Sequence, residues 1–129
     1  MGEQHKARIL VIDDDPFFRK LLHAHLSHAG YAVQLAEDAV EGGKALLQPD
    51  FDLVLCDISM PFMSGLELLA LLRGTAETAA IPVIFASSRK DTATLSSAQD
   101  LGVCGYLIKP FTSEQLLETV SQCLTQGLR

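Results

Sequence analysis

Polar side chains stand directly after four short apolar runs that lie far apart in the sequence. The runs are residues 8–12, 51–56, 83–86 and 103–108, and the polar residues that end them are Asp13 with Asp14, Asp57, Ser87 and Lys109. Each run has the length and branching of a buried strand. A lone aspartate after a strand is usually a turn former or a helix cap. The same arrangement after four strands instead indicates a shared site.

Brought together, these side chains would form a receptor for a phosphoryl group. Three carboxylates in a low-dielectric cleft repel one another and need a cation, and hard oxygen ligands with room left for water suit Mg²⁺. Asp57 follows the central strand and could be the nucleophile, which would become an aspartyl phosphate. Mg²⁺, Lys109 and Ser87 would then stabilise the charge on the phosphoryl oxygens.

The elements that must position this site alternate along the chain. Strands are expected at residues 8–12, 31–36, 51–56, 83–86 and 103–108, and helices from Pro16 to about 29, from 39 to about Gln48, and at 65–73, 91–99 and 113–126. Asp15 is the expected N-cap of the first helix, while Asp38 with Glu41 and Thr112 with Gln115 have capping-box spacing. Five strands alternating with five helices predict an α/β fold with a parallel sheet covered on both faces. The carboxyl ends of all strands then meet at one edge, where ligands bind in such sheets.

Composition predicts an ordinary globular domain. The chain has 129 residues, of which 48% are hydrophobic and 20% charged, so we expect a single domain over residues 1–129, with residues 1–6 flexible. The net charge of −6 argues against a general affinity for nucleic acid or for anionic membranes. No segment has the length of a membrane span and no signal-peptide pattern is present, so we expect a cytoplasmic protein.

The three cysteines have no spacing typical of a metal site or a disulfide framework. Cys56, Cys104 and Cys123 are odd in number, far apart, and set in apolar runs. We therefore expect three buried free thiols in a reducing compartment.

The whole chain resembles the receiver domain of two-component response regulators, and in particular a single-domain regulator of the chemotaxis type. The stretches that carry the resemblance are residues 9–16, 52–61, 82–88 and 105–111, which fall in the family's order and at its spacing. The resemblance implies a flavodoxin-like (βα)5 fold, a doubly wound parallel sheet with five strands in the order 2-1-3-4-5.

The resemblance also implies roles for the acidic residues. Asp57 would accept a phosphoryl group from a histidine kinase or a phosphotransfer protein. Asp14, Asp57 and the backbone carbonyl of Ser59 would bind Mg²⁺ directly, and Asp13 would act through water. The domain would be a phosphoacceptor that assists its own phosphorylation and dephosphorylation, rather than an enzyme that acts on other molecules.

A switch is implied as well. Ser87 would hydrogen-bond to the phosphoryl group, and Lys109 would bridge it to the acidic cluster, with the Lys109–Pro110 peptide bond in the cis form. Tyr106 matches the family's switch aromatic, which turns inward when Ser87 moves. The signal would be read on the face made by the fourth helix, the fifth strand and the fifth helix.

The implied partners are proteins. A downstream protein or a fused output domain would bind that face, and a homodimer could form through the same face. Neither direct nucleic-acid binding nor membrane binding is expected. The sequence leaves open whether the domain is free-standing or part of a longer regulator.

Three residues depart from the family pattern. Ser64 stands where Asp or Asn is frequent, Ser88 stands where Ala is usual, and Arg89 lies at the expected mouth of the site. These departures leave the lifetime of the phosphoryl group open.

Two other classes of protein compete with this interpretation. A phosphatase of the haloacid dehalogenase type would use Asp13 as nucleophile, but the chain is short for that fold and its cap. A docking module that is not phosphorylated would not need the complete set of acidic residues, serine and lysine.

Overall fold

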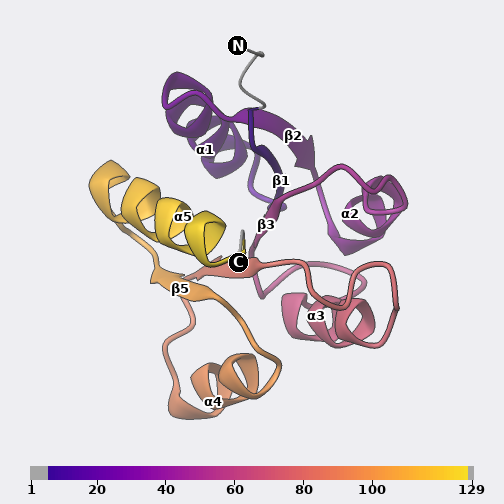
Figure 1. Ribbon diagram of the computed structural model, residues 1–129. Helices are drawn as coiled ribbons and strands as arrows, with labels where there is room; N and C mark the ends of the chain where they lie inside the picture. The colour runs from indigo at the N-terminus through magenta and orange to yellow at the C-terminus, as the bar shows by residue number, and fades with distance from the viewer. Residues whose placement is uncertain (1–5, 128–129) are drawn as a thin grey trace.

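The structure, a computed structural model, describes residues 6–127, in which five strands alternate with five helices (Figure 1). Residues 1–5, which make up most of the segment expected to be flexible, lie outside the described part of the chain. The elements are β1 (Arg8–Ile12), α1 (Pro16–His28), β2 (Ala32–Ala36), α2 (Ala39–Ala45), β3 (Leu53–Cys56), α3 (Gly65–Arg73), β4 (Val83–Ser87), α4 (Thr92–Asp100), β5 (Gly105–Ile108) and α5 (Ser113–Gly127).

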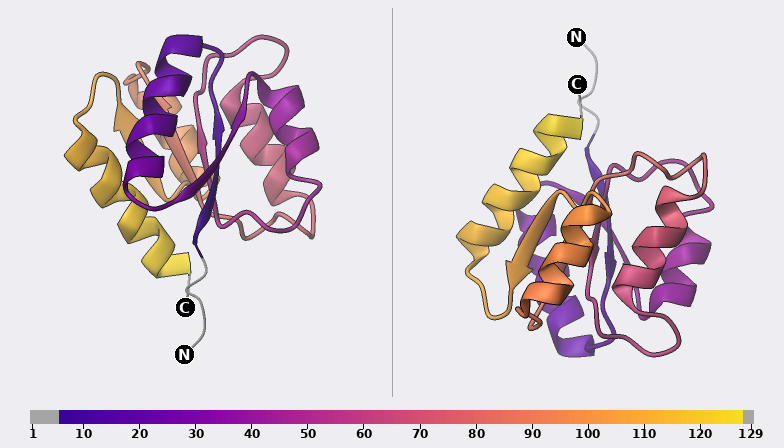
Figure 2. Two further views of the ribbon diagram at one scale, coloured as in Figure 1. Left: turned by 90° about the horizontal axis from the view of Figure 1, so that it is seen from above. Right: turned by 90° about the horizontal axis from the view of Figure 1, so that it is seen from below.

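The strands form one parallel sheet in the order β2-β1-β3-β4-β5, as the resemblance implies. Helices α1 and α5 cover one face, and α2, α3 and α4 cover the other (Figures 1 and 2). The chain leaves β1 toward β2 on one side and later returns to β3 on the other. The strand order therefore reverses beside β1, and the crevice outside the strand ends at that point is where ligands bind in this class of sheet.

Both faces of the central strands are buried, which explains their nearly continuous apolar runs. Along β1, Ile9 and Val11 pack with α1 and α5, whereas Leu10 and Ile12 pack with the helices of the opposite face. All residues of β3 and β4 are buried.

The helix starts agree with the cap signals in the sequence. The Asp15 side chain accepts hydrogen bonds from the first turn of α1, at 3.0 Å from the backbone N–H of Phe17. Thr112 and Gln115 form the expected reciprocal capping box before α5, with distances of 2.9 and 3.0 Å. Asp38 caps α2, but the side chain of Glu41 accepts from the N–H of Glu37 instead of returning to Asp38.

The prediction of three free thiols was wrong for two of the cysteines. Cys104 and Cys123 form a disulfide with a Cα–Cα distance of 5.9 Å, and Cys56 is a buried free thiol. The bridge joins the residue just before β5 to α5, and the two elements approach closely because Gly105 has no side chain. A β-carbon there would lie 2.6 Å from Cγ2 of Thr119. The spacing of the two cysteines does not reveal this, because only the packing of α5 on β5 brings them together.

None of the helices in residues 6–127 combines the length and the apolar character that crossing a bilayer requires.

Candidate functional site

The candidate site lies at the carboxyl edge of the sheet, where backbone hydrogen bonds extend the strand pairing by one residue. The N–H of Asp13 donates to the carbonyl oxygen of Ala36 at 3.1 Å, and that of Asp57 donates to Ile12 at 2.9 Å. The N–H of Lys109 donates to the carbonyl oxygen of Ser87 at 2.9 Å. The residues that directly follow β1, β3 and β5 are therefore positioned by the sheet itself.

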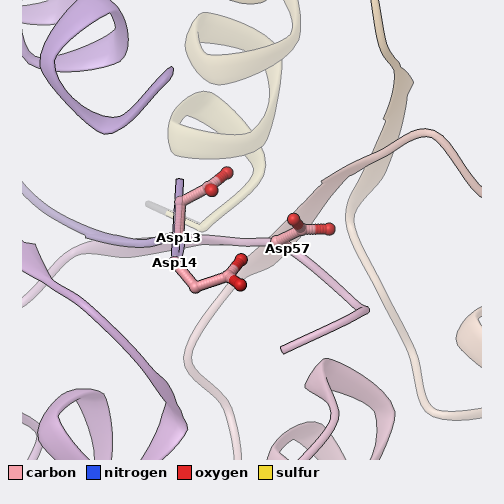
Figure 3. A group of neighbouring side chains, drawn as sticks. All are labelled: Asp13, Asp14 and Asp57. Carbon is pink, nitrogen blue, oxygen red and sulfur yellow. The ribbon is translucent and has the colours of Figure 1, made fainter. Parts of the chain in front are cut away.

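Three carboxylates from two neighbouring strands gather at this edge. Asp13, Asp14 and Asp57 each offer an oxygen, and these atoms all lie within 4.8 Å of one another (Figure 3). Asp13 is 1% exposed and Asp57 is 9% exposed, whereas Asp14 is open to solvent. Among residues 6–127 this is the only group of three or more such side chains close enough to hold a metal ion. Hard oxygen ligands with one side open to water fit Mg²⁺.

Backbone amides orient the two buried carboxylates. Asp13 accepts a hydrogen bond from the N–H of Asp15 at 2.9 Å, and Asp57 accepts one from the N–H of Ile58 at 2.7 Å. In each residue the other oxygen accepts from Lys109, which leaves the carboxylates fixed in direction.

Lys109 joins the acidic residues of both strands. Its Nζ lies 3.0 Å from Asp13 and 3.2 Å from Asp57. Burial alone would lower the pKa of Lys109, but the hydrogen bond to Asp13 and the charges of Asp57 and Asp13 outweigh it, and the pKa is raised. Burial raises the pKa of Asp13, despite the opposing hydrogen bonds from Asp15 and Lys109. The ammonium group is charged at neutral pH and offsets part of the negative charge of the cluster.

Phe18 is a residue of this site that the sequence analysis did not single out. Nζ of Lys109 lies 4.1 Å from the centroid of the Phe18 ring, and this ring meets Phe111 edge-on at 5.6 Å. In the sequence, Phe18 reads as one of the apolar residues with which α1 packs on the sheet. Nothing in its spacing indicates a contact with the lysine.

Ser87 and Tyr106, the expected switch residues, contact the same loop residue. Ser87 ends β4, is 1% exposed, and its hydroxyl oxygen accepts from the N–H of Arg89 at 3.1 Å. The half-buried Tyr106 donates its hydroxyl hydrogen to the carbonyl oxygen of Arg89 at 2.5 Å. Its ring lies edge-on to Phe85 at 6.2 Å, and burial raises its pKa. The backbone of Arg89 therefore links Ser87 to Tyr106.

The side chain of Arg89 is directed to the start of α4. Its guanidinium lies 3.2 Å from Asp91 and 3.1 Å from the hydroxyl of Thr94. Hydrogen bonds from Thr94 and Arg89 lower the pKa of Asp91, the N-cap of α4, to about 2. In this conformation the interactions of Arg89 stabilise the loop and the helix start, and they do not involve the acidic cluster.

The loop after Asp57 carries the remaining residues of interest. Ser59 lies exposed in it, two residues beyond Asp57. Ser64 ends the loop as the N-cap of α3, in a capping box with Glu67 whose two distances are 3.0 and 3.1 Å. The serine thus caps the helix as the more frequent Asp or Asn would. On the other side of the site, the Lys109–Pro110 peptide bond is cis.

Cys56, although next to Asp57, is not a candidate nucleophile. Its thiol is buried and donates a hydrogen bond to the carbonyl oxygen of Asp57 at 3.0 Å. Burial, and then the charges of Asp57 and Asp13, raise its pKa far above neutrality, so the reactive thiolate is not formed.

Comparison with known protein families gives one match that spans most of the chain. The family model described as "Response regulator receiver domain" matches residues 9–121. This range contains all the site residues described above.

Curated relatives agree with that match. The chain is 38% identical over 110 residues to response regulator MprA of Mycobacterium tuberculosis, covering 85% of the chain and 47% of the relative. It is 31% identical over 121 residues to the probable transcriptional regulator ycf29 of Pyropia yezoensis, covering 94% and 54%. The chain therefore spans about half the length of these relatives.

Solved structures match over nearly their whole length. A CheY-like response regulator receiver domain protein from Methanospirillum hungatei superimposes with a TM-score of 0.89 at 28% identity, covering 95% of this chain and 97% of that one. The chemotaxis response regulator CheY4 of Vibrio cholerae gives 0.86 at 28% identity, covering 92% and 99%.

Proposed function

Because the chain belongs to the receiver domains of two-component response regulators, we propose that Asp57 is its phosphoacceptor. The observation that supports this most directly is the convergence of three carboxylates from β1 and β3 with the ammonium group of Lys109 from the end of β5. A carboxylate oxygen of Asp57 attacks the phosphorus of the donor, and the bond from phosphorus to the donor's leaving atom breaks. The donor in the cell is a histidine kinase or a phosphotransfer protein.

Asp14, Asp57 and the backbone carbonyl of Ser59 hold Mg²⁺ in this proposal, and Asp13 contributes through water. The ion, when bound, offsets the charge of the phosphoryl oxygens. Asp14 suits direct coordination because it is the solvent-exposed member of the cluster. Asp13 suits an indirect role because it is buried and already paired with Lys109 at 3.0 Å.

Lys109 and Ser87 stabilise the charge of the transferred group. Lys109 lies 3.2 Å from Asp57, so a phosphoryl group on that carboxylate is within its reach. The hydroxyl oxygen of Ser87 accepts a hydrogen bond from Arg89, which leaves its O–H free to donate to a phosphoryl oxygen. In this way the domain assists its own phosphorylation and, through water attack, its dephosphorylation.

Phosphorylation is passed on through the loop between β4 and α4. A movement of Ser87 toward the phosphoryl group displaces Arg89, whose backbone also holds Tyr106. The surface formed by α4, β5 and α5 then changes its conformation, and a protein partner, a second copy or an output domain binds this surface differently. The curated relatives are about twice as long as this chain, which leaves room for an output domain in them. The phosphoryl group shifts this equilibrium only by its different affinity for the two conformations.

Intact-protein mass spectrometry tests the proposal. The protein is incubated with acetyl phosphate and Mg²⁺ beside Asp57→Asn, Asp13→Asn and a sample with chelator. We expect one phosphoryl adduct on the wild type and none on Asp57→Asn or with chelator, because the acceptor or the ion is then missing. Asp13→Asn keeps a phosphorylatable Asp57 and reacts more slowly.

Two results would contradict this function. An adduct that survives in Asp57→Asn but disappears in Asp13→Asn identifies Asp13 as nucleophile, as in the phosphatase interpretation. A wild type that binds Mg²⁺ but gains no adduct from acetyl phosphate or from a phosphorylated histidine phosphotransfer domain is a docking module.

A further inference from the structure

Among the described residues, the ammonium group of Lys109 contacts two charged groups and one neutral group. The charged groups are the carboxylates of Asp13 and Asp57, at 3.0 and 3.2 Å. The neutral group is the face of the Phe18 ring, whose centroid lies 4.1 Å from Nζ. This is well within the roughly 6 Å over which a ring face attracts a cation.

We propose that Phe18 is a positioning residue for phosphoryl transfer, whose ring holds the Lys109 ammonium beside Asp57. The inference rests on the proposed function, since it assigns Phe18 to the same reaction. Phe18 touches neither Asp57 nor the phosphoryl group in this scheme and acts only through the lysine.

An aromatic ring suits this position because it attracts a cation without carrying a net charge. The site already contains three carboxylates and receives a negatively charged phosphoryl group. A further carboxylate in place of Phe18 would bind Lys109 but repel the incoming group. The ring also restrains the flexible lysine side chain, which otherwise has many rotamers.

The ring itself is held from both sides. Phe18 lies in the first turn of α1, which Asp15 caps by accepting from the N–H groups of Phe17 and Phe18. Its ring packs edge-on against Phe111, at 5.6 Å and an interplanar angle of 89°. Because Phe111 follows Lys109 by two residues, the same aromatic pair fixes α1 against the segment that carries the lysine.

Stepwise fluorination of the Phe18 ring separates its electrostatic effect from its packing. Mono-, di- and trifluorophenylalanine keep the shape of the ring but progressively weaken its negative face. We expect the rate constant for phosphorylation by acetyl phosphate at saturating Mg²⁺ to fall along the series, by roughly 3-fold to 30-fold in total. Phe18→Trp retains the rate, and Phe18→Leu loses it by a similar factor.

Phe17 provides the matched control. It lies next to Phe18 in the same turn but is 75% exposed. Among the contacts of the described residues its ring has none with Lys109. The same fluorinated residues at Phe17 leave the rate unchanged.

A second measurement needs neither metal nor phosphoryl group. In the unphosphorylated, metal-free protein, the ring current of Phe18 should shift the ε-methylene protons of Lys109 upfield, because Nζ lies 4.1 Å from the ring centroid. We expect this NMR shift to disappear in Phe18→Leu and to persist in the fluorinated variants, which shows that they are folded alike.

The possible outcomes separate the inference from the proposed function. A rate that does not change along the fluorinated series, while Asp57 of the wild type is phosphorylated, overturns the inference alone. Absence of the upfield shift in the wild type does the same. A wild type that is not phosphorylated on Asp57 overturns the proposed function and the inference with it.

Discussion

Gly65, the first residue of α3, lies directly against the backbone that carries Asp57. Its N–H donates to the carbonyl oxygen of Ile58 at 2.8 Å. A β-carbon on Gly65 would collide with the carbonyl oxygen of Asp57 and approach the ring of Phe85 to 3.0 Å. The segment that follows β3 and the start of α3 therefore pack together only with a hydrogen atom at this position.

Gly65→Ala should lower both stability and phosphorylation. Because backbone atoms must move to make room, we expect a loss of about 1–3 kcal/mol in the free energy of unfolding. The shift displaces Asp57 from Lys109, so phosphorylation by acetyl phosphate should slow as well. Urea unfolding and intact-mass kinetics measure the two effects.

Gly74→Ala, at the other end of α3, is the matched control. Its β-carbon would meet only ordinary contacts, at 3.6 Å or more. It should change the free energy of unfolding by less than about 0.5 kcal/mol. Equal effects of the two substitutions would show that the close approach at Gly65 does not constrain Asp57.

At the scale of single residues, the sequence predicted the site residues that directly follow strands. It did not predict the contacts that form only when the helices pack on the sheet. Asp13, Asp57 and Lys109 each follow a strand, and a parallel sheet brings such residues to one edge. The contact of Phe18 with Lys109 and the disulfide between Cys104 and Cys123 both join segments remote in sequence through helix packing on the sheet. No local pattern encodes the distance between them.

At the scale of elements, helix starts were more predictable than helix ends. Helix α2 was expected to reach Gln48 but ends at Ala45. Leu46 still donates to Gly42, four residues back, but Leu47 and Gln48 donate only three residues back, to Lys44 and Ala45. The last turn tightens in this way because two glycines weaken the short helix and Pro49 cannot continue it.

The two glycines of α2 should respond oppositely to alanine. A β-carbon on Gly43 meets nothing within 4 Å, whereas one on Gly42 would collide with the side chain of Ile12. Gly43→Ala should stabilise the protein by up to about 1 kcal/mol through helix propensity. Gly42→Ala should destabilise it by about 1–3 kcal/mol through overpacking.

Urea unfolding followed by circular dichroism compares these variants directly. Because both substitutions have the same chemistry in adjacent positions, their difference reports the packing of α2 on β1. Stabilisation by both would mean that Ile12 adopts another rotamer at little cost.

At the scale of the whole molecule, Arg73 and a disulfide add long-range interactions to the part of the chain that follows α3. Arg73, at the end of α3, donates to the carbonyl oxygens of Leu101 and Gly102, after α4, at 3.0 and 3.2 Å. It also donates to Ile81, before β4, at 2.8 Å. The Cys104–Cys123 disulfide then joins the residue just before β5 to α5.

Reduction of this disulfide should lower the free energy of unfolding by about 3 kcal/mol, since the unfolded chain gains the entropy of an open loop. Urea unfolding with and without a reductant measures the difference. The double variant Cys104→Ser, Cys123→Ser is the control and should not respond to the reductant. Identical unfolding of the oxidised and reduced wild type would show that the bridge adds nothing to stability.

The disulfide also determines what a cut in the backbone does to the molecule. It closes a covalent ring between two residues 19 positions apart, and this ring contains β5, Lys109 and the greater part of α5. A protease that cleaves one peptide bond inside the ring leaves a nicked chain in one piece, and one that cleaves outside it releases a fragment. Gel electrophoresis of a partial digest without and with reductant would therefore tell the two kinds of cut apart.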